Sequence, residues 1–225
     1  MILDSNKKIV AEKAVEEIKD GMTVGLGSGS TVYWMLQALG ERVKDGLEIV
    51  GIPTSQKTEK LAKELGIPLA DFSSVDGIDL AIDGADEVDP HLNLLKGGGG
   101  SLVREKIVDI LAKRLIIIVD ETKVVDYLGT FSLPVEVVPF GWETTSKRIA
   151  EYGCLPRRRE QNGEAFISDN GNYILDCDFE SIEKPAELHE NLKKLVGVVE
   201  TGLFINMADV VMVGHAGMVD VLTKA

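Results

Sequence analysis

The segment that decides the fold is MTVGLGSGST, residues 22–31. Its apolar part, Met22 to Leu26, predicts a short buried strand, and the part rich in glycine and hydroxyl groups predicts a tight turn. Apolar residues with helical spacing follow over residues 32–43. This order brings backbone N–H groups together at the start of a helix, where unpaired amides and the helix dipole favour a phosphate. The alternative is a turn that needs glycine for its conformation alone.

The order of strand and helix recurs along the first part of the chain. A helix over residues 5–20, capped by Ser5, precedes the first strand. Three further apolar runs each come before a helical pattern: 49–52 before 55–65, 80–82 before 101–113, and 116–119 before 122–127. This alternation predicts an α/β fold with a Rossmann-like, mostly parallel sheet and helices on both faces.

The pattern changes after Gly129. Strands are expected at 134–138, 154–158, 165–168, 173–176 and 198–201, and helices at 142–152 and 186–195. The sequence DNGN at 169–172 predicts a hairpin, because Asn-Gly between two strand-like runs favours a tight turn. An apolar run at 209–213 predicts a return to the main sheet. We therefore expect a Rossmann-like domain over 1–130 and 206–225 and a smaller, inserted α+β domain over 131–205.

The charge balance excludes several classes of partner. The chain has 225 residues, with 24 Lys and Arg against 37 Asp and Glu, which gives a formal net charge of −13. Nucleic acids and anionic membrane surfaces bind clustered Lys and Arg, so neither is an expected partner. No strongly apolar stretch approaches the roughly 20 residues of a membrane-spanning helix, and the first residues contain no apolar signal region. We expect a cytoplasmic protein.

The residues that commonly bind metals show no ligand pattern. Cys154 and Cys177 form no C-x-x-C motif, so we expect buried thiols instead of a disulfide framework or a thiolate metal site. The three histidines, His91, His189 and His215, lack ligand spacing. We therefore expect no metal.

The turn at 25–31 lacks the motifs of nucleotide sites. Ser30 takes the place of the third glycine in G-x-G-x-x-G, and Pro53-Thr54-Ser55 follows the second strand, where an acidic residue would bind a ribose. The Gly-Lys-Ser/Thr ending of a P-loop is also missing from this turn. Neither a dinucleotide nor ATP is indicated.

An acidic loop follows the third predicted strand, at the edge of the sheet where ligands bind in α/β folds. It contains Asp83, Asp86, Glu87 and Asp89. A solvated acidic loop is one interpretation, and a site for a hard cation is another. The third interpretation is a functional carboxylate, because Asp83 directly follows a buried-looking strand and a buried carboxylate is costly without a partner.

A glycine-rich loop, KGGGG at 96–100, precedes the next predicted helix. Four consecutive glycines are disfavoured in helices and strands, so the backbone here must pass close to another group. Ser101 is placed to cap the helix. Glu105 lies in its first turn, where it either complements the helix dipole or acts as a base at the edge of a glycine-lined pocket. The residues expected to form the packed face of this helix are Val103, Ile107, Ile110 and Leu111.

Together these loops resemble those of the A-type ribose-5-phosphate isomerases. The matching blocks are Gly27 to Thr31, Asp83 to Glu87, Lys96 to Gly99 with Arg104 to Lys106, Leu133 to Val137, Asp169 to Asn172, and Gly197 to Phe204. The resemblance covers nearly the whole chain. It implies interconversion of D-ribose 5-phosphate and D-ribulose 5-phosphate through an enediolate, without a metal or organic cofactor, by a homodimer or homotetramer with a Rossmann-like and a smaller α+β domain.

The resemblance also implies roles for individual residues. Glu105 matches the proton-transferring base, Asp83 and Asp86 match the acidic pair, and Lys96 matches a catalytic lysine. Positions implied to bind the substrate are Ser28, Gly29, Ser30, Thr31, Asp83, Gly84, Ala85, Asp86, Lys96, Gly97, Gly98, Gly99, Lys123 and Lys7. Ser28 stands where the family often has threonine, and the hydroxyl is retained.

Two other functions are compatible with the phosphate turn. One is a sugar-phosphate sensor on the same fold that keeps the turn without the chemistry, and the other is a sugar-phosphate deaminase on a related fold. Glu105 together with Lys96 favours the isomerase over a sensor. The basic run Arg157 to Arg159 is expected to be a solvated or inter-subunit surface.

Overall fold

The computed structural model describes residues 2–224, which form two compact units. The first unit comprises the residues up to Ala85, Arg104–Val124 and the residues from Met207 onward. The second comprises Asp86–Val103 and Val125–Asn206. Each unit has its own cluster of buried apolar side chains. The domain limits expected at 131 and 205 stay a prediction.

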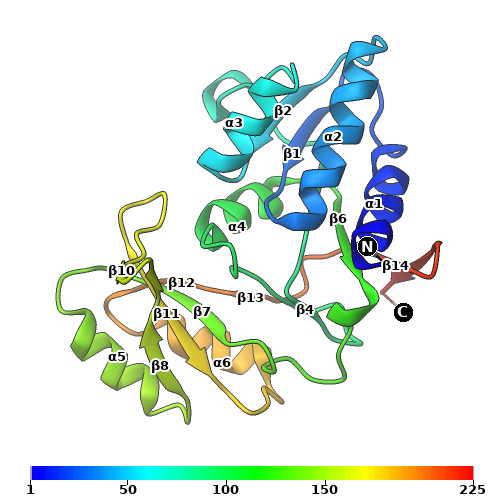
Figure 1. Cartoon of the computed structure of the whole chain (residues 1–225). Helices are drawn as coiled ribbons and strands as arrows, with labels where there is room; N and C mark the ends of the chain where they lie inside the picture. Colours follow the sequence, from blue (N-terminus) through cyan, green and yellow to red (C-terminus); the bar gives the residue numbers. More distant parts are fainter. Residues whose placement is uncertain (1, 225) are drawn as a thin grey trace. The chain divides into compact units, whose positions relative to one another are not determined.

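The first unit contains a six-stranded sheet in the order β15-β14-β6-β3-β1-β2 (Figure 1). The strands are β1 (Thr23–Leu26), β2 (Val50–Pro53), β3 (Leu80–Asp83), β6 (Leu115–Asp120), β14 (Val210–His215) and β15 (Met218–Thr223). Neighbouring strands are parallel except β14 and β15, which are antiparallel. The predicted α/β fold with a mostly parallel sheet is confirmed. The antiparallel edge strand β15 was not predicted.

Helices pack on both faces of this sheet. They are α1 (Ile2–Val15), α2 (Ser30–Lys44), α3 (Gln56–Glu64) and α4 (Leu102–Leu111). Side chains of α1 and α2 share one core with the buried residues Leu26 of β1 and Ile82 of β3. The opposite face meets α4, because a Cβ atom at Gly25 would lie 2.7 Å from a methyl group of Val108. Glycine at position 25 therefore allows α4 to approach β1 closely.

The second unit contains a four-stranded antiparallel sheet in the order β12-β7-β11-β8. Its strands are β7 (Leu133–Val137), β8 (Leu155–Arg158), β11 (Tyr173–Asp178) and β12 (Val198–Thr201), with helices α5 (Trp142–Ala150) and α6 (Pro185–Lys193). A three-stranded sheet of β4 (Glu87–Val88), β5 (Leu94–Leu95) and β13 (Leu203–Phe204) and a hairpin of β9 (Glu160–Gln161) and β10 (Glu164–Ala165) complete the unit. This is the mixed α+β content that the sequence predicts for the later part of the chain.

Several expected elements differ in length or place. The first helix ends at Val15, and Ser5 lies inside it instead of capping it. The expected helix at 122–127 is a single 3₁₀ turn, η2 (Glu121–Lys123); a second one, η1, spans Phe72–Ser74.

The expected hairpin at 169–172 contributes one isolated bridge, between Ile167 and Tyr173. The tighter turn is at Asn162-Gly163, where both φ angles are positive, 55° and 82°. Two successive positive φ angles suit a two-residue hairpin turn, and Asn-Gly is the sequence that favours them. This second Asn-Gly pair was the missed signal.

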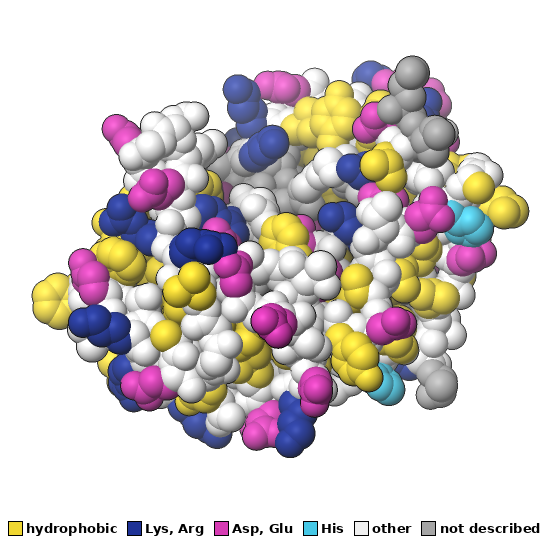
Figure 2. Space-filling view, turned by 60° about the horizontal axis from the view of Figure 1, so that its bottom comes forward, with side chains coloured by type: hydrophobic (Ala, Val, Ile, Leu, Met, Phe, Trp, Pro, Cys, Tyr) yellow, Lys and Arg dark blue, Asp and Glu magenta, His cyan; other side chains and the backbone are white. Residues whose placement is uncertain are grey.

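Acidic and basic side chains are interspersed on the face of the molecule in Figure 2, with apolar side chains between them. Within residues 2–224, no helix is both long and apolar enough to cross a membrane. The same residues include no group of three or more His, Cys, Asp or Glu side chains arranged to hold a metal ion.

Candidate active site

The predicted phosphate turn lies at the carboxyl end of β1. Residues 27–29 follow the strand, and α2 begins at Ser30. The residue before the helix, Gly29, has φ 110° and ψ 179°, and no side chain among residues 2–224 caps the helix there. An uncapped helix start leaves its first N–H groups to an external acceptor, and the helix dipole favours a negative charge at the same place. The geometry therefore suits a phosphate.

A lysine from another helix reaches this turn. The Lys7 ammonium group, on α1, donates a hydrogen bond to the Ser30 hydroxyl at 3.0 Å. The predicted positions Lys7 and Ser30 are thus neighbours although they are 23 residues apart in the chain. Lys123 follows β6 in the 3₁₀ turn η2 and is partly exposed. Lys7 places a positive charge beside the helix start, where it complements an anion.

Three hydroxyl groups that the sequence did not suggest as site residues contact Ser28 of the turn. Ser28 Oγ lies 2.8 Å from Thr54 Oγ1, 2.9 Å from Ser55 Oγ and 3.1 Å from Thr58 Oγ1. Thr58 also donates to the carbonyl oxygen of Gly27 at 2.8 Å. The three partners are buried at the end of β2 and the start of α3, where Ser55 caps the helix. The signal in the sequence is the hydroxyl pair Thr54-Ser55 directly after a strand, which also speaks against a dinucleotide site.

Asp83 is fully buried at the end of β3, directly under the same turn. Its Oδ1 atom accepts hydrogen bonds from the backbone N–H groups of Ser28 at 2.9 Å and Gly84 at 2.7 Å. A Cβ atom at Gly27 would lie 2.2 Å from this oxygen, so only glycine fits there. Asp83 therefore fixes the backbone path of the turn and of Gly84 together.

The other acids of this loop are also held by backbone groups. Asp86 accepts from Gly98 N–H at 2.8 Å. Glu87 accepts from two N–H groups, those of Gly129 and Phe131, at 2.7 and 2.6 Å. Asp89 accepts from the N–H groups of His91 and Asn93, both at 2.8 Å. The interpretation of a solvated acidic loop is therefore wrong, because each of the four carboxylates accepts at least one backbone N–H and three of them are buried.

Helix α4 presents its charged side to the interior. Glu105 is 5% exposed, and Asp109, one turn later, is 3% exposed. The expected packed face is wrong: Ile107, Ile110 and Leu111 are 46%, 69% and 52% exposed. Burying a carboxylate costs free energy that an apolar side chain would not cost. A helix that turns acids inward and apolar side chains outward therefore marks Glu105 as a functional candidate.

The second unit contains the lysine and the glycine loop. Lys96 is 1% exposed, its N–H donates to the Gly202 carbonyl oxygen at 2.8 Å, and its ammonium group lies 5.2 Å from the centre of the Phe204 ring. Gly97 has φ 102°, a conformation that glycine adopts without strain. The N–H of Gly98 binds Asp86, as described above, so the predicted residues Asp86 and Gly98 are in direct contact.

The predicted residues thus fall into two groups, one in each unit. In the first unit, direct contacts join Lys7 to Ser30, and Asp83 to Ser28 and Gly84. It also holds Gly29, Thr31, Ala85, Glu105 and Lys123. The second unit brings together Asp86 and Gly98 on the loop that contains Lys96, Gly97 and Gly99.

The family model and the relatives above 30% identity point to one family. The family model for ribose 5-phosphate isomerase A (phosphoriboisomerase A) matches residues 50–217. A curated relative from Oceanobacillus iheyensis, ribose-5-phosphate isomerase A 1, is 57% identical over 213 residues, which is 94% of this chain and 95% of the relative. A relative from Gluconobacter oxydans, ribose-5-phosphate isomerase A, is 53% identical over 94% of this chain and 93% of its own length.

Two solved structures have the same fold. A D-ribose-5-phosphate isomerase in complex with phospho-erythronic acid superposes with a TM-score of 0.96 at 41% identity, and the match covers 100% of both chains. The ribose 5-phosphate isomerase from Plasmodium falciparum gives a TM-score of 0.95 at 44% identity, with 98% of this chain and 99% of that chain covered. These matches extend over the residues of both units.

Proposed function

This chain belongs to the ribose-5-phosphate isomerase A family, and we propose which of its residues carry out the reaction. It interconverts D-ribose 5-phosphate and D-ribulose 5-phosphate in the non-oxidative pentose phosphate pathway. The family match over most of the chain carries the function. The assignment of residues rests on their burial and hydrogen bonds within each unit.

The phosphate of the substrate binds at the start of α2. The uncapped helix start, the hydroxyl groups of Ser30 and Thr31 and the ammonium group of Lys7 support this role. Lys123 supplies a second positive charge. The phosphate does not react, so the binding energy gained from it serves to orient carbons 1 and 2 of the sugar.

Glu105 transfers the proton between carbons 1 and 2. An aldose becomes a ketose when a base removes the proton from C2 and returns it to C1 of an enediolate, so one carboxylate serves both carbons. Burial at 5% exposure supports this assignment, because a carboxylate removed from water is a stronger base for a carbon acid. A sensor that only binds the sugar phosphate would not need this buried acid.

Lys96 stabilises the negative charge that develops on the substrate oxygen. Its burial supports this role, since a fixed cation acts more strongly where water is excluded. The sugar exists mainly as a closed furanose, and its opening requires proton transfer at the ring oxygen and O1. We assign this step to Asp83, with Asp86 as the second candidate, and we propose that no metal takes part.

The first experiment measures the conversion of ribose 5-phosphate to ribulose 5-phosphate by the purified protein with EDTA present. We expect full turnover. Loss of turnover on chelation would show that a metal takes part and would contradict the metal-free mechanism.

The second experiment is Glu105→Gln, which keeps the shape of the side chain and removes the base. We expect kcat to fall by about 10²–10⁴-fold, the range typical of general acid–base catalysis. Binding of phospho-erythronic acid, measured by calorimetry, should stay near wild type. Glu64→Gln, an exposed position at the end of α3, is the matched control. Near-normal turnover by Glu105→Gln would move the proton transfer to another residue.

The protein works as a cytoplasmic homodimer or homotetramer in this proposal. The exposed apolar side chains of α4, Ile107, Ile110 and Leu111, support an assembly that covers them. Light scattering of the purified protein measures the number of subunits.

A further inference from the structure

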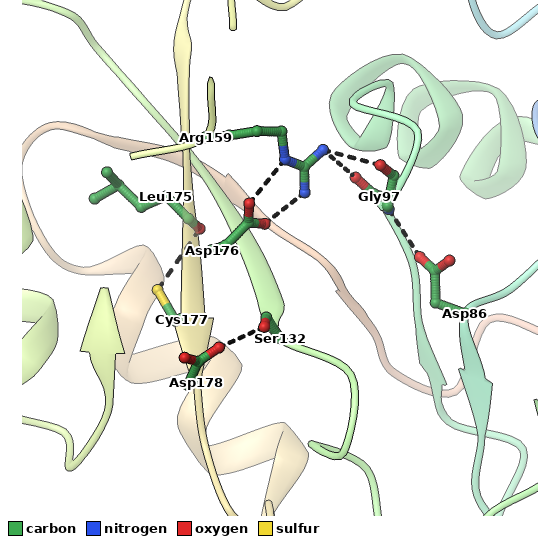
Figure 3. Close-up of polar contacts among 9 residues, drawn as sticks. Asp86, Gly97, Ser132, Arg159, Leu175, Asp176, Cys177 and Asp178 are labelled. Atoms are coloured by element: carbon green, nitrogen blue, oxygen red, sulfur yellow. Dashed lines mark hydrogen bonds and ion pairs between the residues drawn. The ribbon is translucent and has the colours of Figure 1, made fainter. Parts of the chain in front are cut away.

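Arg159 links the four-stranded sheet of the second unit to the glycine loop (Figure 3). Its guanidinium group binds both carboxylate oxygens of Asp176 on β11, with Nε to Oδ2 at 2.9 Å and Nη2 to Oδ1 at 2.5 Å. The remaining nitrogen, Nη1, donates to the carbonyl oxygens of Gly97 and Gly98, both at 3.0 Å. All three nitrogens of the fork are therefore used, and the side chain is only 14% exposed. Arg159 was expected to lie on a solvated or inter-subunit surface. Instead its guanidinium group contacts Asp176 and the glycine loop of the same chain.

These bonds determine the direction of two successive peptide groups. The C=O and N–H of a trans peptide point in opposite directions, and no cis peptide bond occurs within residues 2–224. Because the carbonyl oxygen of Gly97 faces Arg159, the N–H of Gly98 points away from it, and it donates to Asp86. The carbonyl oxygen of Gly98 also faces Arg159, so the N–H of Gly99 likewise points away from the guanidinium group.

The loop is held at further points in the same unit. The N–H of Gly100 donates to the Gly97 carbonyl oxygen at 2.9 Å, which closes a four-residue turn. A Cβ atom at Gly100 would lie 2.4 Å from the ring of Phe166, so this ring packs directly on the loop. The Arg159 guanidinium group lies 5.7 Å from the centre of the same ring. Arg159 is itself anchored, because its N–H donates to the Ile174 carbonyl oxygen at 2.8 Å.

We propose that Arg159, oriented by Asp176, is a positioning residue for the isomerase reaction. It directs the N–H groups of Gly98 and Gly99 away from the sheet, so that Gly98 orients the Asp86 carboxylate and Gly99 donates to an oxygen of the sugar. Fixed backbone donors stabilise developing negative charge because they need no reorganisation during the reaction. This inference rests on the proposed roles of Asp86 and of the glycine loop.

The test compares two neighbouring arginines that each pair with an aspartate of β11. Arg159→Ala removes the pair with Asp176 and the bonds to the loop, whereas Arg157→Ala removes only the pair with Asp178. We expect kcat for ribose 5-phosphate to fall about 10²-fold in Arg159→Ala, the effect typical of a small displacement of positioned groups, with KM changed much less. Arg157→Ala should keep the wild-type kcat.

A third variant separates charge from geometry and remains informative if Arg159→Ala does not fold. Arg159→Lys keeps the positive charge, but one ammonium group does not reproduce the planar fork that binds the carboxylate and two carbonyl oxygens. We expect its melting temperature to lie close to that of the wild type while kcat stays low. Wild-type kcat in Arg159→Lys, or equal kcat in Arg159→Ala and Arg157→Ala, would overturn the positioning role. Failure of the wild-type protein to isomerise ribose 5-phosphate would instead contradict the proposed function.

Discussion

Thr58→Val tests whether the buried hydroxyl groups hold the phosphate turn. Valine has nearly the shape of threonine, so the change removes the hydroxyl group with little change in packing. The structure predicts three losses: the bond to the Gly27 carbonyl oxygen at 2.8 Å and the contacts with Ser55 and Ser28 at 3.0 and 3.1 Å. Thr58 is only 5% exposed, so water does not readily replace these partners.

The size of the effect follows from the cost of leaving a buried acceptor without its donor. That cost is about 1–3 kcal/mol, and we take about 2 kcal/mol for the Gly27 carbonyl oxygen. A chain of this length then loses about 4–8 °C in melting temperature. Since the turn is the proposed site of the non-reacting phosphate, KM for ribose 5-phosphate should rise while kcat changes little.

The assay combines thermal unfolding with steady-state kinetics. Thr58→Ser is the control, because it keeps the hydroxyl group and loses only a methyl group. It should retain the wild-type KM. A Thr58→Val protein with the wild-type melting temperature and KM would show that this hydroxyl group does not hold the turn. A lower melting temperature with an unchanged KM would show that the hydroxyl groups stabilise the fold without shaping the phosphate site.

Two further predictions concern groups with shifted pKa values. The Lys113 ammonium group and the backbone N–H of Thr23 hold the pKa of Asp79 below its ordinary value of 3.8. The ionised carboxylate therefore stabilises the folded state above pH 3.8 and loses this effect as the pH falls through the lowered pKa. Urea unfolding should show Asp79→Asn less stable than wild type at pH 7 and equal to it in strong acid; a constant difference would contradict this. A hydrogen bond between the two thiols lowers the pKa of Cys154. The same hydrogen bond, together with burial, raises the pKa of Cys177. Iodoacetamide should modify Cys154 in the native protein and Cys177 only after unfolding, as read by peptide mass spectrometry, and equal rates would be inconsistent with the structure.

Local patterns predict the strands and turns of the first unit well. The apolar run and glycine turn at 22–31 become β1 and the start of α2, and Asp83 ends β3 as expected. These features depend on residues adjacent in the chain, where backbone preferences and burial act together. The glycine loop before α4 is likewise predicted from adjacent residues. Local patterns therefore locate the carboxyl edge of the sheet, where most candidate residues lie.

The orientation of α4 could not be predicted in this way. Helical spacing shows which side of a helix is apolar, but it does not show that this side faces the interior. In α4 the buried side contains Glu105 and Asp109 along with Leu102 and Val108, and the apolar residues Ile110 and Leu111 are exposed. This orientation departs from the usual pattern, and departures of this kind are expected at functional sites, which agrees with the proposed role of Glu105.

Sequence patterns also could not predict contacts between residues that are far apart in the chain. Arg159 and Gly97 are 62 residues apart, and Thr58 and Gly27 are 31 apart. No sequence motif marks either pair, because the acceptor in each case is a backbone carbonyl oxygen, which every residue has. The run Arg157 to Arg159 looks uniform in the sequence. In the structure these three side chains have different partners: Asp178, the rings of Trp142 and Tyr173, and the glycine loop.

The acidic loop explains how a protein with a net charge of −13 binds a phosphate. Residues 71–89 contain seven acids and no Lys or Arg. Four of these carboxylates, from Asp83 to Asp89, accept backbone N–H groups, so local dipoles offset part of their charge and hold the loops in place. In the proposed site the phosphate needs positive charge only at the start of α2, where the helix dipole and the Lys7 ammonium group lie. Acidity of the whole chain is therefore compatible with a small anionic substrate, because the field at the site depends on the nearest groups.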